Sequence, residues 1–314
     1  MYIEQAYKGI NTWWRVALTI FLTTGLLMAS LVMYFILTPE QMQAQYDMMK
    51  GMPSIVALIF NLAPFVFLLA LVFICIYVLH KRSILSLTTS RPRFDIRRIL
   101  FAFFLMLIIS VIGFAISYYS DSSDIIWNFD AANFAILLVV SLILFPIQVG
   151  YEEYIFRGYL MQQIGIVAKN RWFPLLITSV LFGLFHSANP EVMEMGFGIM
   201  AFYIGTGLLL GVITLMDESL ELAIGIHLGN NIIAALLMTS EFSALQTDAI
   251  FKYTGTGNAG MLNEMIVTMA VTYPIILVIL AKRYKWNNWQ SKLFGRTLSK
   301  ESFLSTTYDS SKLQ

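Results

Sequence analysis

The sequence has 314 residues, of which 58% are hydrophobic and 12% are charged, and its formal net charge is +1. A soluble globular domain carries about 25% charged residues, so this composition excludes an ordinary water-soluble protein. The single cysteine, Cys75, excludes an intrachain disulfide and any cysteine-rich metal site.

Apolar stretches follow one another along almost the whole chain. A helix needs about 20 apolar residues to cross a hydrocarbon core of about 30 Å. Seven or eight runs reach that length. They lie near residues 15–37, 55–79, 99–119, 132–150 or further, 172–187, 192–215, 220–238 and 261–281. The fifth run, 172–187, is the shortest. We expect an all-α fold, a polytopic transmembrane bundle of about eight helices that forms a single membrane domain over residues 1–314.

Basic residues gather on one predicted side of the membrane. Six basic residues lie between the second and third runs, where Asp95 is the only acidic residue. In residues 121–130, by contrast, every charged residue is acidic. With the N-terminus inside and eight spans, 17 of the 20 basic residues are cytoplasmic, as positive-inside bias requires. We therefore expect cytoplasmic termini and a basic cytoplasmic tail at 282–314. These basic patches are expected to meet lipid headgroups rather than nucleic acid.

Ionisable side chains inside apolar spans are functional candidates, because each costs about 2.5–3.5 kcal/mol at the centre of an inserted helix. Glu152 is one of them. Three predicted helices also carry an i, i+4 pair, which stacks two side chains on one helix face. These pairs are Glu153 with Arg157, Phe182 with His186, and His227 with Asn231.

The depths of three of these side chains agree if the fourth helix continues to about Gln163. At 1.5 Å per residue, Glu152 is then about 16 Å from the cytoplasmic end of its helix. His186 is about 21 Å and His227 about 10 Å from the starts of their helices. We therefore expect the longer helix, with the three side chains meeting in the cytoplasmic half or the middle of the membrane.

Each feature also has a purely structural interpretation. Glu153 and Arg157 alone are more often a structural ion pair, and a single buried histidine is usually a helix contact. His80 ends a span beside two basic residues, where an interfacial role is sufficient. The joint occurrence of a carboxylate, two histidines and an amide at matched depth favours a functional site over a purely structural role.

A carboxylate and an imidazole can together take a proton from water and return it to a leaving amine. A second histidine and an asparagine can donate hydrogen bonds to the oxyanion of a tetrahedral intermediate. Glu152, His186 and His227 could instead hold Zn²⁺ with an open position for water. The spacing of these residues does not separate the two mechanisms.

At these residues the chain resembles the CPBP family, also called the Abi family. That family contains the type II, Rce1-like CAAX prenyl endopeptidases and their bacteriocin-processing relatives. Its signature, E-E-x-x-x-R, then F-x-x-x-H, then H-x-x-x-N or D, is matched in order within about residues 130–240.

The resemblance implies an intramembrane endopeptidase acting on membrane-associated or lipidated peptides. Glu152 and His186 would activate the water, and His227 and Asn231 would stabilise the oxyanion. Glu153, Arg157 and Phe182 would support the site. The family is commonly labelled metalloprotease, but the glutamate mechanism that we favour needs no cofactor, and Zn²⁺ is the alternative.

Two other functions remain as alternatives. One is a catalytically inactive immunity or scaffolding protein of the same fold, and the other is a proton-coupled transporter that uses Glu152 and Arg157 as a relay. In every case the expected location is a bacterial cell membrane. The expected partners are lipid and, for the peptidase, a peptide or protein substrate, with no nucleic acid.

Overall fold

The computed structural model describes residues 1–257 and 259–311, so Lys312 of the basic tail lies outside the described residues. The α-helices are α1 (Trp13–Ile36), α2 (Pro39–Lys50), α3 (Ser54–Leu62), α4 (Pro64–Ile74), α5 (Ile84–Thr88), α6 (Ile96–Ser120), α7 (Ala131–Glu153), α8 (Met161–Ala168), α9 (Trp172–Leu184), α10 (Pro190–Met195), α11 (Met200–Asp217), α12 (Glu221–Leu237), α13 (Ala259–Tyr284), α14 (Trp289–Phe294) and α15 (Lys300–Ser311). The remaining elements are the 3-10 helices η1 (Ile3–Lys8) and η4 (Phe197–Ile199), the π-helices η2 (Cys75–Leu79) and η3 (Tyr154–Leu160), and the strands β1 (Ile125–Trp127), β2 (Met238–Ser240) and β3 (Phe251–Tyr253).

Six helices of the described chain are long and apolar enough to cross a membrane, and α9 and α12 are shorter apolar helices. The outward faces of the long helices carry large apolar side chains, such as Phe21, Phe67 and Ile112, that are more than half exposed. Such surfaces are stable only against lipid. The expected all-α polytopic membrane bundle is therefore confirmed, with six long and two shorter apolar helices.

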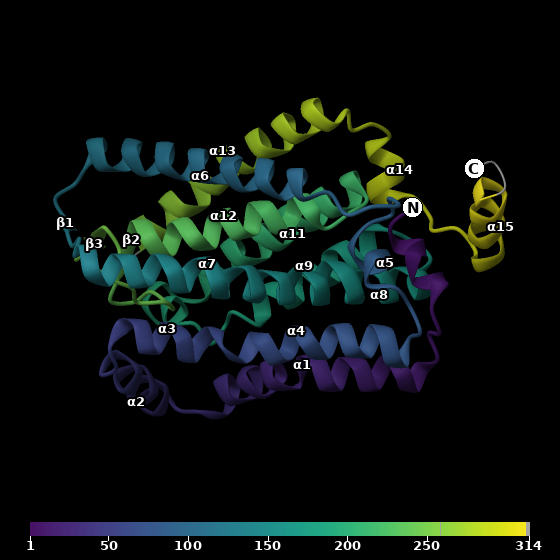
Figure 1. Ribbon diagram of the computed structural model, residues 1–314. Helices are drawn as coiled ribbons and strands as arrows, with labels where there is room; N and C mark the ends of the chain where they lie inside the picture. The colour runs from purple at the N-terminus through teal and green to yellow at the C-terminus, as the bar shows by residue number, and fades with distance from the viewer. Residues whose placement is uncertain (258, 312–314) are drawn as a thin grey trace.

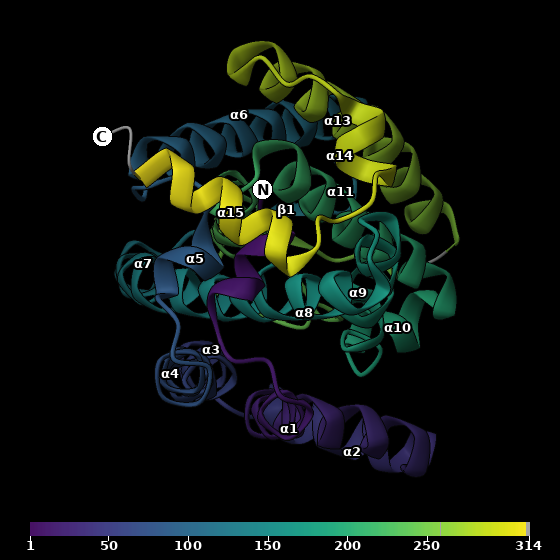
Figure 2. The ribbon, with the colours of Figure 1, turned by 90° about the vertical axis from the view of Figure 1, so that its right-hand side faces the viewer.

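The helices form layers, in which α13 is inclined to its neighbours (Figures 1 and 2). Helix α1 and the successive helices α3 and α4 lie on one side of the bundle, and α6 and α13 lie on the opposite side. Helices α7, α9, α11 and α12 lie between these two layers. Burial agrees, because 56% of the apolar window of α11 is buried against 11% for α6 and for α13. The central helices are therefore those that carry the candidate site residues.

Helix α12 packs closely against α6 through two glycines. A Cβ on Gly229 would stand 2.8 Å from the carbonyl oxygen of Phe103, and a Cβ on Gly225 would overlap the carbonyl oxygen of Ile99. Small residues allow helix backbones to approach closely in a membrane. This contact holds α12, and with it His227, against the outer layer.

The two ends of the bundle differ. At one end the short strands form a sheet in the order β1-β3-β2, antiparallel between β1 and β3 and parallel between β3 and β2. The sheet, which we did not predict, joins segments that precede α7, follow α12 and precede α13. Both termini lie at the other end (Figure 1). There η1 is buried, and its Glu4 forms an ion pair of 2.8 Å with Arg171.

Three details differ from or extend the sequence prediction. The chain from 131 to 168 is one continuous helical run through η3, so the longer fourth helix is confirmed.

Helix α9 ends at Leu184, so the prediction that His186 lies within a helix is wrong. His186 lies in the turn before Pro190, at the end of the apolar run. His80 does not face the interface but is fully buried, with hydrogen bonds to Thr19 and Tyr159.

Candidate active site

Two adjacent glutamates mark the end of α7, where the helix changes from α to π geometry. Glu153 is fully buried, and the Glu152 side chain is 9% exposed. The π-helix η3 begins at the next residue. Single π turns within α-helices frequently occur at functional sites, because they shift side chains relative to the regular helical repeat.

His227 from α12 lies between the two carboxylates. Its Nδ1 donates to Oε1 of Glu153 at 2.8 Å, and its Nε2 lies 3.4 Å from Oε2 of Glu152. A carboxylate that accepts from one ring nitrogen fixes the orientation of the imidazole and leaves the other nitrogen for chemistry. Glu153 therefore aims Nε2 of His227 at Glu152.

Arg157 stabilises the charge of Glu153. The two side chains are fully buried, and Nη1 of Arg157 donates to Oε1 of Glu153 at 2.8 Å. The guanidinium also lies 4.2 Å from the centre of the Phe182 ring and donates to the carbonyl oxygen of Gly207 at 3.3 Å. A buried charge is tolerated only when it is paired in this way. The structural ion pair that we expected from the spacing is present, and it also supports His227.

Glu152 pairs with no arginine or lysine among the described residues, whereas Glu153 is paired with Arg157. Oε2 of each glutamate is buried and accepts no hydrogen bond from the described residues. A buried acceptor without a partner costs about 1–3 kcal/mol or more, and a charged one costs still more. Such a group is suited to bind a water or a substrate atom.

His186 reaches the same region from the turn after α9. Its Nδ1 donates to the carbonyl oxygen of Phe182 at 2.7 Å, which leaves Nε2 as an acceptor in the neutral ring. The ring stacks on Tyr203 with centroids 4.5 Å apart, and the Phe182 ring contacts both His186 and His227. Glu152 and His227 both lie close enough to His186 for a charge on either to be felt by its ring. The carboxylate and the two imidazoles therefore occupy one site.

Asn231 lies one turn beyond His227 and is already hydrogen-bonded. Its Nδ2 donates to Oε1 of Gln148 at 3.0 Å, and Gln148 lies one turn before Glu152 on α7. Sequence reasoning missed Gln148 and Tyr203. The i, i−4 spacing of Gln148 from Glu152 was a usable signal, whereas nothing in the sequence around Tyr203 marks its stacking on His186.

The hydrogen bonds of the two histidines bear on the metal alternative. Among residues 1–257 and 259–311 no group of three or more His, Cys, Asp or Glu side chains has the arrangement to hold an ion. Nδ1 of His227 donates to Glu153 and Nδ1 of His186 donates to the carbonyl oxygen of Phe182, so Nε2 of each ring is the nitrogen that a metal would bind. Zn²⁺ held by Glu152, His186 and His227 therefore stays an alternative prediction.

Comparison with known proteins shows which family has a similar sequence around these site residues. Residues 131–233, which contain every candidate site residue, match the family described as "Type II CAAX prenyl endopeptidase Rce1-like". The chain is also similar to "Uncharacterized protein YyaK" of Bacillus subtilis (strain 168), with 30% identity over 249 residues that cover 75% of this chain and 81% of the relative. No solved structure gives a significant match. The chain therefore belongs to the Rce1-like family of type II CAAX prenyl endopeptidases, which are intramembrane proteases.

Proposed function

We propose that this protein is an intramembrane endopeptidase that hydrolyses peptide bonds of membrane-associated or lipidated peptides with a water molecule activated by Glu152. One observation carries the proposal: the buried Oε2 of Glu152 has no hydrogen-bond partner among the described residues and lies 3.4 Å from Nε2 of a histidine that Glu153 orients. A carboxylate in this setting can act first as general base and then as general acid.

In the proposed reaction, Glu152 accepts a proton from the water while the water oxygen attacks the carbonyl carbon of the substrate. His186 accepts a second hydrogen bond from that water through Nε2. His227 donates to the oxyanion through Nε2, which requires a proton on both ring nitrogens because Nδ1 donates to Glu153. Asn231 donates through the N–H of its amide that does not bond to Gln148. Glu152 then returns its proton to the leaving amine, and the C–N bond breaks. No acyl-enzyme forms, and no cofactor is required.

The proposed setting is a bacterial cell membrane, with both termini in the cytoplasm. Bacteriocin precursors and membrane proteins are the proposed substrate classes. An inactive immunity or scaffolding protein of the same family is the alternative, and it makes a different prediction for Glu152, since a scaffold does not need a carboxylate with an unpaired oxygen.

Peptide hydrolysis by the purified protein in liposomes tests the proposal. The wild type is expected to release product, and Glu152→Gln is expected to lower the rate by about 10²–10⁴-fold, the range for general acid–base catalysis. Glu264→Gln, an exposed change on α13, is the matched control and is expected to leave the rate unchanged. Activity is expected to survive a chelator. No hydrolysis by the wild type, together with full biological activity of Glu152→Gln, would support the inactive alternative.

A further inference from the structure

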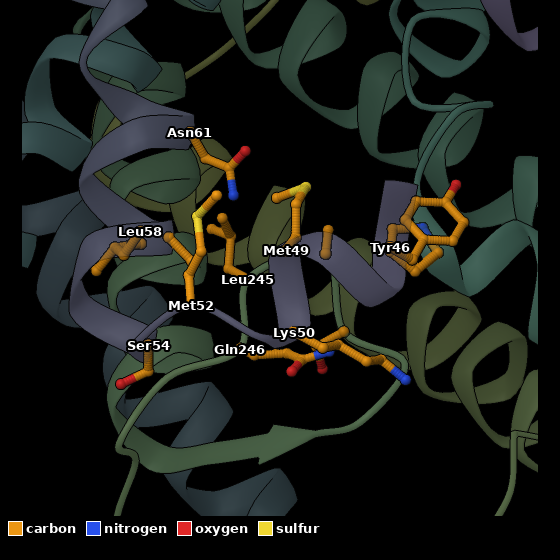
Figure 3. A pocket seen from close by; sticks show the side chains of 13 residues that line it. Tyr46, Met49, Lys50, Met52, Ser54, Leu58, Asn61, Leu245 and Gln246 are labelled. Carbon is orange, nitrogen blue, oxygen red and sulfur yellow. The ribbon is translucent and has the colours of Figure 1, made fainter. Parts of the chain in front are cut away.

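A cavity of about 170 Å³ lies under α2, at the end of the bundle away from the termini. Met49 and Met52 from α2 and the turn after it, Leu58 from α3, and Leu245 from the loop after β2 give it an apolar lining. Figure 3 shows these side chains spread across the cavity, with Tyr46 towards one end and Asn61 towards the other. Methionine side chains adapt to apolar groups of different shape, so this lining can accept varied residues.

The cavity is joined to the candidate active site by a short stretch of chain. Pro190 forms part of its wall, and the hydroxyl of Tyr46 donates to the carbonyl oxygen of Ala188 at 2.7 Å. Four residues span at most about 14 Å, so Pro190 lies within that distance of His186. An extended peptide held at the candidate site therefore reaches the cavity within about four residues.

Polar groups at the cavity match what an extended peptide offers. Asn61 and Lys50 line it, and Lys50 makes no ion pair with any described residue within 4.0 Å. Beside it, Oε1 of Glu191 accepts from the backbone N–H of Ala244 at 2.7 Å, whereas Oε2 is buried and lacks a partner among the described residues. A peptide N–H can satisfy Oε2, and an acidic side chain can pair with Lys50.

The covering helix favours a peptide over a lipid. Helix α2 (PEQMQAQYDMMK) is polar, buries none of its residues and stands outside the six long spans. Its first turn is held by its own capping box, in which Thr38 and Gln41 bond to each other's backbone. This helix thus forms a polar wall beyond the apolar spans, where a water-exposed part of a substrate passes.

We propose that this cavity is a substrate subsite that binds an apolar side chain of an extended peptide next to an acidic residue, within about four residues of the scissile bond. The inference rests on the proposed peptidase function and names a feature of its substrate. It places the selected residues on the side of the bundle opposite the termini.

Binding to the Glu152→Gln protein tests the subsite without turnover. The probes are two fluorescent decapeptides that differ only in one residue, Glu or Lys, beside a leucine. The Glu peptide is expected to bind more tightly, and Lys50→Glu is expected to reverse the preference by about fivefold, as an exposed charge pair allows. Lys252→Glu is the matched control, because Lys252 lies at the same end of the bundle but does not line the cavity. A preference that Lys50→Glu leaves unchanged overturns the proposal.

Filling the cavity gives a second, kinetic test. Ala57→Leu adds three carbon atoms to its wall and is expected to raise KM about tenfold at unchanged kcat, whereas Ala70→Leu on the exposed face of α4 is expected to change neither. An unchanged KM in Ala57→Leu contradicts the subsite while hydrolysis by the wild type upholds the proposed function.

The two proposals fail separately. If the peptides bind with the expected charge preference but the wild type does not hydrolyse them, the proposed peptidase function is overturned and the peptide-binding cavity is upheld. Displacement of the peptide by phospholipid vesicles of either charge, with no effect of Lys50→Glu, identifies the cavity as a lipid site and overturns the inference.

Discussion

The two neighbouring glutamates have different physical tasks, and single substitutions separate them. Glu153 balances Arg157 and orients His227, whereas Glu152 pairs with no arginine or lysine among the described residues. Removing one partner of a buried ion pair costs about 3–5 kcal/mol. We expect Glu153→Gln to lower the melting temperature in detergent strongly, and Glu152→Gln to leave it within a few degrees of the wild type. If both variants unfold at the same lowered temperature, Glu152 is a structural residue.

His80 predicts a pH dependence of stability. It lies just beyond the span that ends at Leu79, and burial, together with the nearby cations Arg82 and Arg15, lowers its pKa from 6.5 to about 4. Below pH 6.5 the unfolded chain therefore binds a proton that the folded chain does not, and stability falls as the pH drops from 6.5 towards 4.

Thermal unfolding of wild type and His80→Gln at pH 7.5 and pH 5 measures this effect. The variant loses the hydrogen bonds to Thr19 and Tyr159 and is expected to unfold at a lower temperature at pH 7.5. The difference from wild type is expected to shrink at pH 5, because only the wild type carries the penalty for protonation. A difference that stays constant between the two pH values contradicts this assignment.

At the residue scale, part of the site could be predicted from the sequence. The three motifs identified Glu152 and His227, and the structure places them 3.4 Å apart. The bond from His227 to Glu153 could not be predicted, because spacing along one helix points only to Arg157. The position of His186 beyond the end of α9 was also missed, since the apolar run continues past the last helical residue.

At the scale of elements, the contact between α12 and α6 controls the position of His227. Gly225 faces the backbone of α6 at Ile99 with no room for a Cβ, whereas Gly113 on α6 has open space around it. We expect Gly225→Ala to push α12 outward, to lower the melting temperature and to reduce peptide hydrolysis by at least about tenfold, since a displacement of about 1 Å is enough for such losses. Gly113→Ala is expected to be neutral or slightly stabilising.

Circular dichroism distinguishes a shifted helix from a lost one. Gly225→Ala is expected to keep its helix content while its melting temperature and activity fall. Equal behaviour of Gly225→Ala and Gly113→Ala would show that the close approach of the two helices has no energetic weight.

The apolar runs predicted the long helices to within a few residues, because hydrocarbon thickness fixes their length. Three kinds of element escaped that reasoning. The strands have three residues each and no usable alternation, the π-helix η3 has no hydrophobic signature, and the polar helix α2 resembles an ordinary loop in composition. The cavity under α2 could therefore not be anticipated from the sequence.

At the scale of the whole molecule, the proposed orientation assigns the two ends of the bundle to different compartments. The N-terminus, α14 and α15 lie at one end, and α2 and the sheet lie at the other (Figure 1). Positive-inside bias favours the cytoplasm for the first end, as proposed above. The proposed subsite would then select residues that have crossed to the far side of the membrane. The orientation of a substrate in the membrane would therefore help to decide whether it is cleaved.

Cysteine labelling checks this orientation, and the chain is suited to it because its only cysteine, Cys75, is buried. In a Cys75→Ala background, Gln45→Cys on α2 and Ser305→Cys on α15 place one exposed thiol at each end. In intact cells a membrane-impermeant maleimide is expected to label Gln45→Cys alone, and to label Ser305→Cys only after permeabilisation. Labelling of Ser305→Cys alone would invert the molecule, and the subsite would then select residues on the cytoplasmic side. Labelling of both positions in intact cells would mean that the two ends face the same compartment, and the bundle would no longer span the membrane along its length.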